Sequence, residues 1–536
     1  MAIRLSKGIG EIQKAELKYI WQPPDIYDEV HDNNIWLVYG RKGSGKSTMV
    51  DYLGTESEQA HVIVIRPRKT NLFKRALAAI KASSDEDRII EESFANTIDF
   101  ILTTKIMRDL VEPNTFYPPG SPQETMYRFM SQHNLMEGSV LKKAINLFSI
   151  AGKLKIVPDV DAALDKVEGG VDYDDAKDAL MEYTSDINKS IILCIDDIDE
   201  VGFSFSRFDR LFVNGLLILM VRANINYLEN ESKVRIVLTI PSELYFHSTL
   251  WGGDWVSGKA ECLIWNNTED MQELVNKRIA MELGIKKNTP RFKTDIYSVD
   301  SRQTWNRVFP TSVSNMLGRS EVAFEYLLRH TFYTPRHVLD LCDKIISAIF
   351  ENGRSKMGLE EASDSITKAD WNKIFQESVQ EFTGSSASNF SDLFGEIYEG
   401  LEEVMKAFRS RPLIWNRPQL LRYVEEQELQ LIRPDKETIF HGESLISVLH
   451  RIGFLGLGTR DVVAAPLGTN KYNVKFSFLE KTVYQGGWEI AVISPMFYDT
   501  YDIRPIENTI VTPHEKLILA SKAMHKVMDY DVTTNT

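Results

Sequence analysis

The sequence lacks the features that mark several broad classes of protein. It has three cysteines in 536 residues, Cys194, Cys262 and Cys342, and no CxxC pair. We therefore expect neither a disulfide framework nor a cysteine zinc site, and predict buried thiols. The amino-terminal segment MAIRLSKGIGEIQKAELKY has no apolar core of the kind that a signal peptide needs.

Long hydrophobic runs and an excess of positive charge are also missing. The most apolar stretch, Leu211 to Val221, is interrupted by Asn214 and followed by Arg222. It is shorter than the roughly 20 residues that span a bilayer, so we predict a buried helix, no membrane association and a cytoplasmic location. The net charge of −14 disfavours non-specific coating of nucleic acid, although a local basic patch remains compatible with it.

A glycine-rich segment with the spacing GxxxxGKS begins directly after an apolar run, Asn34 to Tyr39. Glycines at such positions let the backbone wrap round a phosphate group, and the helix that follows directs its positive end to the same anion. Lys46 is expected to reach the β- and γ-phosphates, and the Ser47 hydroxyl to bind Mg²⁺. The bland alternative is a glycine-rich turn with a chance lysine. The residues predicted to contact the nucleotide are Gly40, Arg41, Lys42, Gly43, Ser44, Gly45, Lys46, Ser47 and Thr48.

A second segment carries carboxylates. The apolar run Ile191 to Ile195 ends in Asp196 and Asp197, as expected for a buried parallel strand whose end faces a ligand. In P-loop enzymes the strand beside the P-loop strand brings a carboxylate to the magnesium ion, and we assign that role to Asp196. Asp197 could orient the water that attacks the γ-phosphate. An acidic exit from a strand is the alternative. The sequence has no guanine-reading NKxD motif, so the predicted cofactors are ATP and Mg²⁺.

Three further runs with strand character follow the same alternation with helical stretches, at 61–65, 234–240 and 261–265. The fold class predicted is α/β, with a parallel-sheet P-loop NTPase core. Ligands bind beyond the carboxyl ends of such strands. Thr239 and Ser242 occupy that end of the fourth strand, and we favour Thr239 as the contact to the γ-phosphate or the water. A purely structural threonine is equally compatible with the pattern.

The remaining chain divides by composition and periodicity, and its length predicts two to four domains at about 150 residues each. Between the second strand and Asp196 lies a mostly helical insertion, about 68–188, that serves either partner recognition or packing. Its apolar residues have helical spacing over 72–80 and 98–110, and its aspartate-rich stretch 158–188 is typical of a linker or a solvated helix. The predicted parts are an N-terminal segment 1–33, the core 34–267 with this insertion, a helical lid 268–350, a flexible linker 351–387, a winged-helix-like α+β domain 388–510 and a C-terminal tail 511–536.

The winged-helix prediction rests on three helical stretches, 393–408, 418–426 and 444–452, followed by strand-like runs at 472–478 and 488–493. The third helix would read DNA in such a domain. It carries one firm positive charge, Arg451, and the domain is slightly acidic. Packing or partner binding is therefore favoured over DNA reading.

Together these segments resemble the additional-strand P-loop ATPases related to AAA+ proteins, and more closely their bacterial STAND and KAP-like relatives. The resemblance lies in GRKGSGKST at 40–48, ILCIDDIDE at 192–200, RIVLTIPSELY at 235–245 and TPRHVLDLCDKI at 334–345. It implies that Arg336, on the lid, senses the γ-phosphate. Many relatives have glutamate where Asp197 stands, which implies slow turnover, and arginine where Thr239-Ile240-Pro241 stands.

Three functions follow from the pattern and the resemblance. The first is an ATPase that acts as a nucleotide-dependent switch, with a role in antiviral defence implied by the family and a separate protein effector as partner. The second is a nucleotide-gated scaffold or sensor with negligible turnover, and the third a DNA-directed ATPase similar to replication initiators and loaders. A homo-oligomer is compatible with all three. Arg207, Arg210 and Arg222 are candidates for an arginine finger, and nothing selects one of them.

Overall fold

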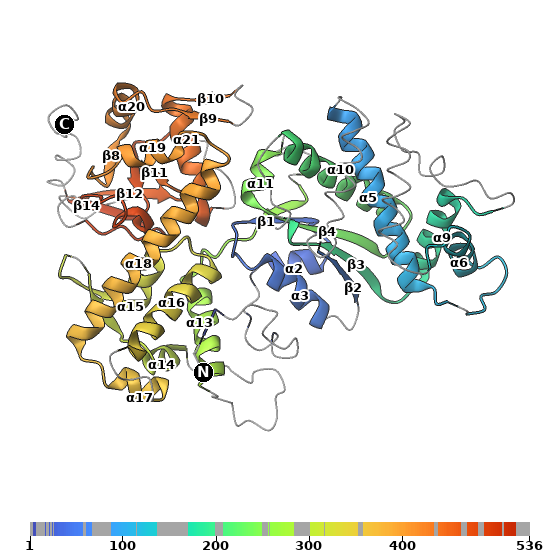
Figure 1. Cartoon of the computed structure of the whole chain (residues 1–536), viewed down its shortest axis with the longest axis horizontal. Helices are drawn as coiled ribbons and strands as arrows, with labels where there is room; N and C mark the ends of the chain where they lie inside the picture. The colour runs from blue at the N-terminus through green and yellow to red at the C-terminus, as the bar shows by residue number, and fades with distance from the viewer. Residues whose placement is uncertain are drawn as a thin grey trace. The chain divides into compact units, whose positions relative to one another are not determined.

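The chain forms two compact units, each seen in the computed structural model (Figure 1). Unit 2 comprises residues 25–40 and 46–261, and unit 1 comprises residues 1–24, 41–45 and 262–536. The structure describes residues 4–6, 17, 21, 24, 26–56, 60–66, 87–113, 115–136, 170–198, 207–248, 256, 258–283, 301–315, 317–351, 357–433, 438–461, 469–480, 487–505 and 509–520.

Unit 2 is built on a five-stranded parallel sheet with the order β2-β3-β4-β1-β5. Its strands are β1 (Leu37–Gly40), β2 (Ala60–Ile65), β3 (Ser190–Ile195), β4 (Val234–Pro241) and β5 (Ala260–Cys262). Every residue of β4 is buried, as expected for a central parallel strand whose residues, apart from Arg235 and Thr239, are apolar. The predicted parallel-sheet α/β core is thereby confirmed.

The strand order corrects one expectation. The strand that ends in Asp196 does not lie beside β1, because β4 runs between them: Leu238 of β4 pairs with Leu37 on one side and with Ile195 on the other. Because β4 has a neighbouring strand on each side, all of its residues are buried. All three strands still end at the same edge of the sheet.

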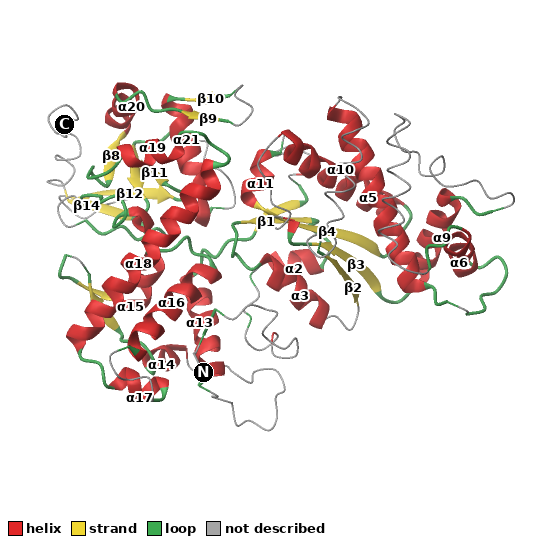
Figure 2. Ribbon diagram, in the orientation of Figure 1, coloured by secondary structure: helices red, strands yellow, loops and turns green. Residues whose placement is uncertain are grey.

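Helices cover both faces of this sheet (Figure 2). One face carries α2 (Ile26–His31) and α3 (Lys46–Glu56), and the other carries α10 (Arg207–Glu229) and α5 (Asp87–Leu110). Helices α5 and α10 approach closely at Gly215, where a Cβ atom would lie 2.6 Å from the Phe94 ring. The shorter helices of the unit are α6 (Pro122–Gln132), α9 (Tyr173–Asp186) and α11 (Ser242–His247).

Helix α10 contains the predicted buried segment 211–221 but is much longer than that segment. Its residues Asp209–Glu229 have the length and mean hydropathy of a membrane span, and are the one such stretch in the part of the chain that the structure describes. That window is 72% buried inside the protein, and Asn214 and Asn224 within it are buried and hydrogen-bonded to Glu91 and Ile236. In the structure it is a core helix of unit 2.

The predicted insertion is only partly described. The predicted helical stretch 98–110 falls within α5, and the aspartate-rich stretch near 173–186 forms α9, capped by Asp172. The predicted helix at 72–80 lies outside the described residues. Two of the cysteines, Cys194 and Cys342, are buried as predicted, Cys262 is partly exposed, and none of the three forms a disulfide.

The amino-terminal half of unit 1 is helical. It contains α13 (Thr268–Glu282), α14 (Ser301–Asn306), α15 (Ala323–Arg329), α16 (Pro335–Phe350), α17 (Leu359–Asp364), α18 (Lys368–Gly395) and α19 (Leu401–Ala407), with a small hairpin of β6 (Ser312–Ser314) and β7 (Ser320–Val322). A flexible linker was expected at 351–387, but much of this range is helical in the structure. Helix α18 runs through it, because Trp371, Phe375, Phe382 and Phe390 give the segment a buried aromatic face.

The carboxyl-terminal half of unit 1 holds a five-stranded antiparallel sheet with the order β14-β12-β11-β13-β8. Its strands are β8 (Ile414–Asn416), β11 (Leu455–Arg460), β12 (Thr469–Lys475), β13 (Ile490–Ile493) and β14 (Leu517–Ala520). Helices α20 (Arg417–Glu426) and α21 (Gly442–Ile452) precede β11 along the chain. The sheet is larger than the expected two-stranded ribbon, and its edge strand β14 comes from the segment expected to be a tail.

Candidate functional site

The GxxxxGKS segment is a strand, a tight turn and a helix. Strand β1 ends at Gly40 and helix α3 begins at Lys46. Within the turn, Gly43 and Gly45 have φ angles of 86° and 100°, in the left-handed region that favours glycine. At Gly43 a Cβ atom would also lie 2.7 Å from the Cβ of Arg336. The turn therefore requires glycine at both positions for its backbone geometry, and at Gly43 also for lack of space.

This segment is divided between the two units. Gly40 and the residues from Lys46 onward belong to unit 2, whereas Arg41–Gly45 belongs to unit 1. In unit 2, the Lys46 ammonium donates a hydrogen bond to the Gly40 carbonyl at 2.8 Å. The lysine thus folds back over the strand end from which the turn starts.

Ser47 brings the two predicted carboxylates together. Its hydroxyl lies 3.2 Å from Oδ1 of Asp196 and 2.9 Å from Oδ1 of Asp197. The serine stands in the first turn of α3, and the aspartates follow the last residue of β3. The fold therefore joins residues 149 positions apart, as the two sequence patterns together predicted.

Asp196 is held from three sides and is almost fully buried, with 1% of its surface exposed. Its backbone N–H donates to Ile65 of β2 at 3.0 Å, and the Thr239 hydroxyl donates to its Oδ1 at 2.5 Å. Burial, with the charge of Asp196 next, raises the pKa of the adjacent Cys194 thiol to about 12. Thr239 thus fixes the carboxylate of Asp196 by a hydrogen bond.

Asp197 lies at the strand tip in a left-handed conformation, with φ of 57°. Aspartate adopts this conformation more readily than most residues, because its short side chain can hydrogen-bond locally. Its Oδ1 faces Ser47 and its Oδ2 lies 3.1 Å from Nε of Arg66. The next acidic residues, Asp199 and Glu200, lie outside the described part of the chain.

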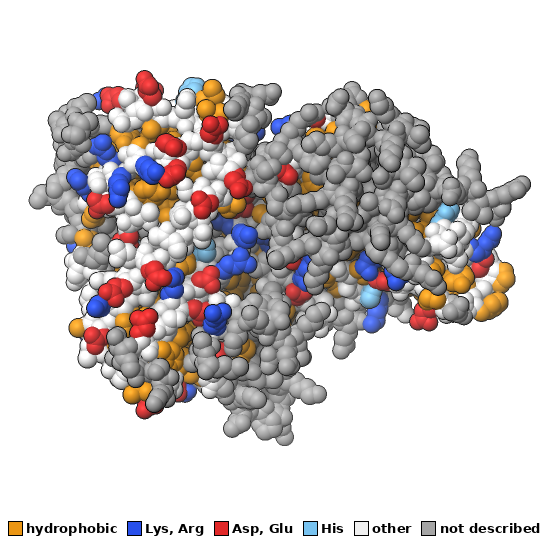
Figure 3. Space-filling model, in the orientation of Figure 1, with side chains coloured by type: hydrophobic (Ala, Val, Ile, Leu, Met, Phe, Trp, Pro, Cys, Tyr) orange, Lys and Arg blue, Asp and Glu red, His pale blue; other side chains and the backbone are white. Residues whose placement is uncertain are grey.

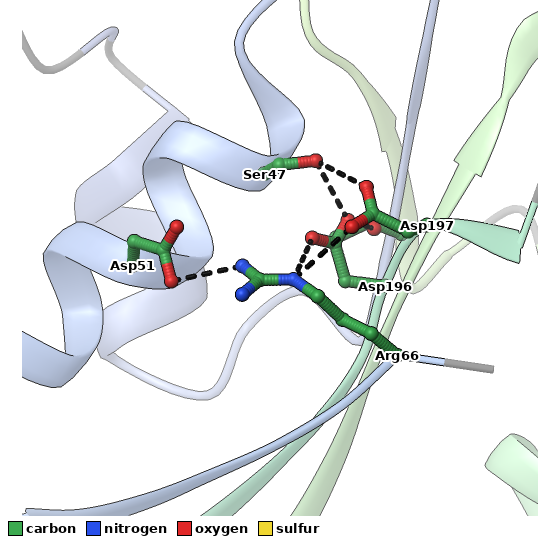
Figure 4. A network of polar contacts seen from close by, with 6 residues as sticks. Ser47, Asp51, Arg66, Asp196 and Asp197 are labelled. Atoms are coloured by element: carbon green, nitrogen blue, oxygen red, sulfur yellow. Dashed lines mark hydrogen bonds and ion pairs between the residues drawn. The ribbon is translucent and has the colours of Figure 1, made fainter. Parts of the chain in front are cut away.

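Arg66, which the sequence analysis did not single out, completes the network (Figure 4). It follows β2, and its guanidinium lies 2.8 Å from Asp51 of α3, 3.1 Å from Asp197 and 3.4 Å from Asp196. Burial lowers the pKa of Arg66, but the hydrogen bond and charge of Asp51, with the charges of the two other aspartates, outweigh it and raise the pKa above its ordinary value. The side chain is therefore a permanent cation.

A simple signal would have identified Arg66. Strands β2 and β3 are neighbours in register, with Ile65 opposite Ile195. Because parallel strands end at one edge of the sheet, the residues directly after these two partners must lie close together. Arg66, the first residue after β2, was therefore predictable as a neighbour of Asp196.

The oxygen atoms at this edge suit a small hard cation. Mg²⁺ prefers oxygen ligands, and commonly takes one or two from the protein and the rest from phosphates and water. The Ser47 hydroxyl and the Asp196 carboxylate lie within hydrogen-bond distance of each other and offer such a pair. Among the described residues no group of three or more His, Cys, Asp or Glu could hold a metal ion by itself.

The other part of the segment, Arg41–Gly45, is held by residues of unit 1. Arg41 donates to the Ile452 carbonyl at 2.5 Å, and its guanidinium lies 4.6 Å from the centre of the Phe332 ring. The Trp265 indole donates to the Ser44 carbonyl at 2.8 Å. Arg41 therefore points to the end of α21.

Arg336 of α16 also contacts this part of the segment. Its backbone N–H lies 3.3 Å from the Gly43 carbonyl, in the first turn of α16. Its side chain is exposed. Lys42 is exposed as well, and Thr48 lies in α3 with partial exposure.

The remaining candidate residues are Ser242 and the three arginines considered for an arginine finger. Ser242 is buried at the start of α11, directly after β4. Of the candidate finger arginines, Arg222 donates to Asn96 at 3.0 Å, and Arg210 lies 3.9 Å from Asp87. The side chain of Arg207 lies outside the described residues.

The chain matches no known family model, and none of the curated proteins is similar to it.

Proposed function

We propose that the chain binds ATP with Mg²⁺ at the GxxxxGKS segment and hydrolyses it slowly, as a nucleotide-dependent conformational switch of the AAA+/STAND type. The observation that carries this proposal is the meeting of Ser47, Asp196 and Asp197 at the carboxyl edge of a parallel sheet. A glycine turn and a helix N-terminus adjoin the same serine. The order in which β4 separates β1 from β3 supports the additional-strand class.

Each residue of this edge has a chemical part in the proposal. The N-terminus of α3 and the turn offer backbone N–H donors to phosphate, and Lys46 exchanges the Gly40 carbonyl for phosphate oxygens. Ser47 and Asp196 would hold Mg²⁺, which neutralises phosphate charge when bound. Thr239 keeps the Asp196 carboxylate oriented by its hydrogen bond.

Asp197 is the candidate that positions the attacking water. It lies at the strand tip and is partly exposed, with 26% of its side chain accessible. An aspartate at this place reaches less far than glutamate, and the pairing with Arg66 holds it further back. Both features support slow turnover and a switch in preference to a motor.

Arg336 is proposed to report the γ-phosphate to the lid, because its backbone already meets Gly43 of the turn. The sequence of α19, β8, α20, α21, β11 and β12 supports a winged-helix-like domain. On the face shown in Figure 3, acidic and basic side chains of unit 1 are interspersed. This distribution supports a protein effector or a second copy of the chain as partner, and DNA less well.

Two variants test the proposal directly. Lys46→Ala should abolish ATP binding, and Asp197→Asn should retain ATP binding while phosphate release is lost. ATP at about 100 times its dissociation constant should add about 2.7 kcal/mol to the stability of the wild-type domain that binds it. Lys105→Ala, at a partly exposed lysine that pairs with Asp109 in α5, is the matched control and should behave as wild type.

The outcomes separate the candidate functions. If wild type and Asp197→Asn bind ATP equally and neither releases phosphate, the chain is a nucleotide-gated sensor without turnover. Phosphate release that DNA stimulates, with a steep dependence on salt, would favour the DNA-directed function. If Lys46→Ala binds ATP as tightly as wild type, the GxxxxGKS segment is not the nucleotide site.

A further inference from the structure

Arg66 occupies a place at the sheet edge that the proposed reaction does not explain. Its guanidinium contacts three carboxylates, of Asp51, Asp196 and Asp197, within 3.4 Å or less. Two of these are the carboxylates that face Ser47. A permanent cation therefore shares the carboxylates to which a divalent metal ion would bind.

The two aspartates divide their oxygens in the same way. In each, Oδ1 faces the Ser47 hydroxyl, and Oδ2 faces Nε of Arg66. Figure 4 shows the pair lying between the serine and the arginine. The Oδ1 atoms thus face Ser47, and the guanidinium partly neutralises the two carboxylates from the side of their Oδ2 atoms.

Asp51 gives the guanidinium a second anchor. It stands one helical turn after Ser47 in α3, and its oxygen lies 2.8 Å from an Nη atom of Arg66, while the other contacts use Nε. The side chain of Asp51 is 10% exposed and that of Arg66 is 24% exposed. Arg66 can therefore loosen its hold on the aspartate pair and remain paired.

We propose that Arg66 is a positioning residue that weakens the hold of Asp196 and Asp197 on Mg²⁺ and so speeds the release of the metal with nucleotide. The inference rests on the proposed function, because it concerns the metal of that same site. Its physical basis is that a positive charge beside a carboxylate reduces the attraction of that carboxylate for a second cation. A switch that must reset after slow turnover needs such release.

If Arg66 weakens Mg²⁺ binding, its removal should change the Mg²⁺ affinity in the direction opposite to that expected for a purely structural residue. Removing the charge in Arg66→Gln should strengthen Mg²⁺ binding. If Arg66 only held the aspartates in place, its loss would disorder them and weaken Mg²⁺ binding. Arg66→Lys keeps the charge and should stay within threefold of wild type.

The experiment uses the full chain loaded with a fluorescent ADP analogue. The dissociation rate of the analogue is measured over a Mg²⁺ titration, and the midpoint gives the Mg²⁺ affinity of the complex. We expect the midpoint of Arg66→Gln to fall at least fivefold below that of wild type. Arg88→Gln removes an equal charge at an exposed arginine of α5 and should leave the midpoint unchanged.

The result that overturns the proposal is a midpoint for Arg66→Gln at or above that of wild type, or one for Arg66→Lys as low as that of Arg66→Gln. Thermal unfolding shows whether each variant is folded. If Arg66→Gln does not fold, the Mg²⁺ midpoint of Arg66→Lys, expected within threefold of wild type, is the test that remains. If wild type binds no nucleotide, the proposed function fails by itself. Titration of the nucleotide-free protein with Mn²⁺, followed by paramagnetic resonance, still compares wild type with Arg66→Gln.

Discussion

The hydrogen bond from Thr239 to Asp196 allows a quantitative test of how the sheet edge is stabilised. Thr239 is 1% exposed, and its hydroxyl lies 2.5 Å from Oδ1 of Asp196. Thr239→Val keeps the shape of the side chain and removes the donor. A hydrogen bond to a charged group contributes about 1.5–3 kcal/mol to stability. When the donor is removed, the buried carboxylate is still shielded from water and loses one of its partners. We therefore expect a loss of about 2 kcal/mol in the free energy of unfolding of unit 2.

The loss should be visible in thermal unfolding, where it corresponds to about 4 to 8 °C in Tm for a unit of this size. Thr104→Val is the matched control. Thr104 is equally buried, but its hydroxyl donates to the carbonyls of Phe100 and Ile101 in its own helix, which the helix already satisfies. Its replacement should cost less than about 1 kcal/mol. Equal Tm losses in the two variants would refute the reasoning. Thr239→Val should also raise the Mg²⁺ midpoint, opposite to Arg66→Gln.

Further predictions concern unit 1. Gly456→Ala would place a Cβ 2.6 Å from the ring of Phe476, and this overpacking should lower the free energy of unfolding by about 1–3 kcal/mol. Gly384→Ala lies in α18 with open space around it and should raise the free energy of unfolding by about 0.5–1 kcal/mol. Urea unfolding measures both changes. Burial, with the charges of nearby arginines, lowers the pKa of His337 to about 4, and burial lowers that of His450 to about 4. The unfolded chain, with histidine pKa near 6.5, takes up these protons first as the pH falls, so their contribution is complete above pH 6.5 and is lost towards pH 4, by roughly 2 kcal/mol each at pH 5. The urea midpoint of the wild type should fall between pH 7 and pH 5, and that of His450→Gln should fall less. If the midpoint of His450→Gln falls as steeply with pH as that of wild type, His450 is not a source of the pH dependence.

Much of the parallel sheet could be predicted because its longer strands are rich in apolar residues. The expected strands 191–195 and 234–240 differ from β3 and β4 by one residue at an end. Such runs reflect burial on both faces, which is a local property of sequence. The position of β4 between β1 and β3 could not be read from the runs alone, because strand order depends on which faces the intervening helices cover.

The antiparallel sheet was harder to predict for the opposite reason. Strand β11 has the sequence Leu-Gly-Leu-Gly-Thr-Arg, and glycine weakens the strand signal. In the structure these glycines make room for neighbours: a Cβ at Gly456 would collide with Phe476, and one at Gly458 would lie 3.0 Å from Ile490. The need for small residues comes from residues far along the chain, and a local pattern cannot contain it.

The candidate site divides in the same way. The motif spacing brought Ser47, Asp196 and Asp197 into one prediction, and the structure places an oxygen of each aspartate within 3.2 Å of the Ser47 hydroxyl. Arg66 was missed although its place after β2 was visible. The partner of Arg41 was out of reach, because a backbone carbonyl 411 residues away leaves no trace in composition or periodicity.

That long separation has a consequence for the synthesis of the protein. Arg41 leaves the ribosome early, but the carbonyl and the ring that receive it, at Ile452 and Phe478, are made much later. At about 5–20 residues per second, the interval between Gly45 and Phe478 is roughly 20 to 90 s. During that interval the β1 strand can fold with its neighbours while Arg41–Gly45 still lacks the residues that hold it. Segment Arg41–Gly45 of a nascent chain therefore gains these contacts only after Phe478 has been made.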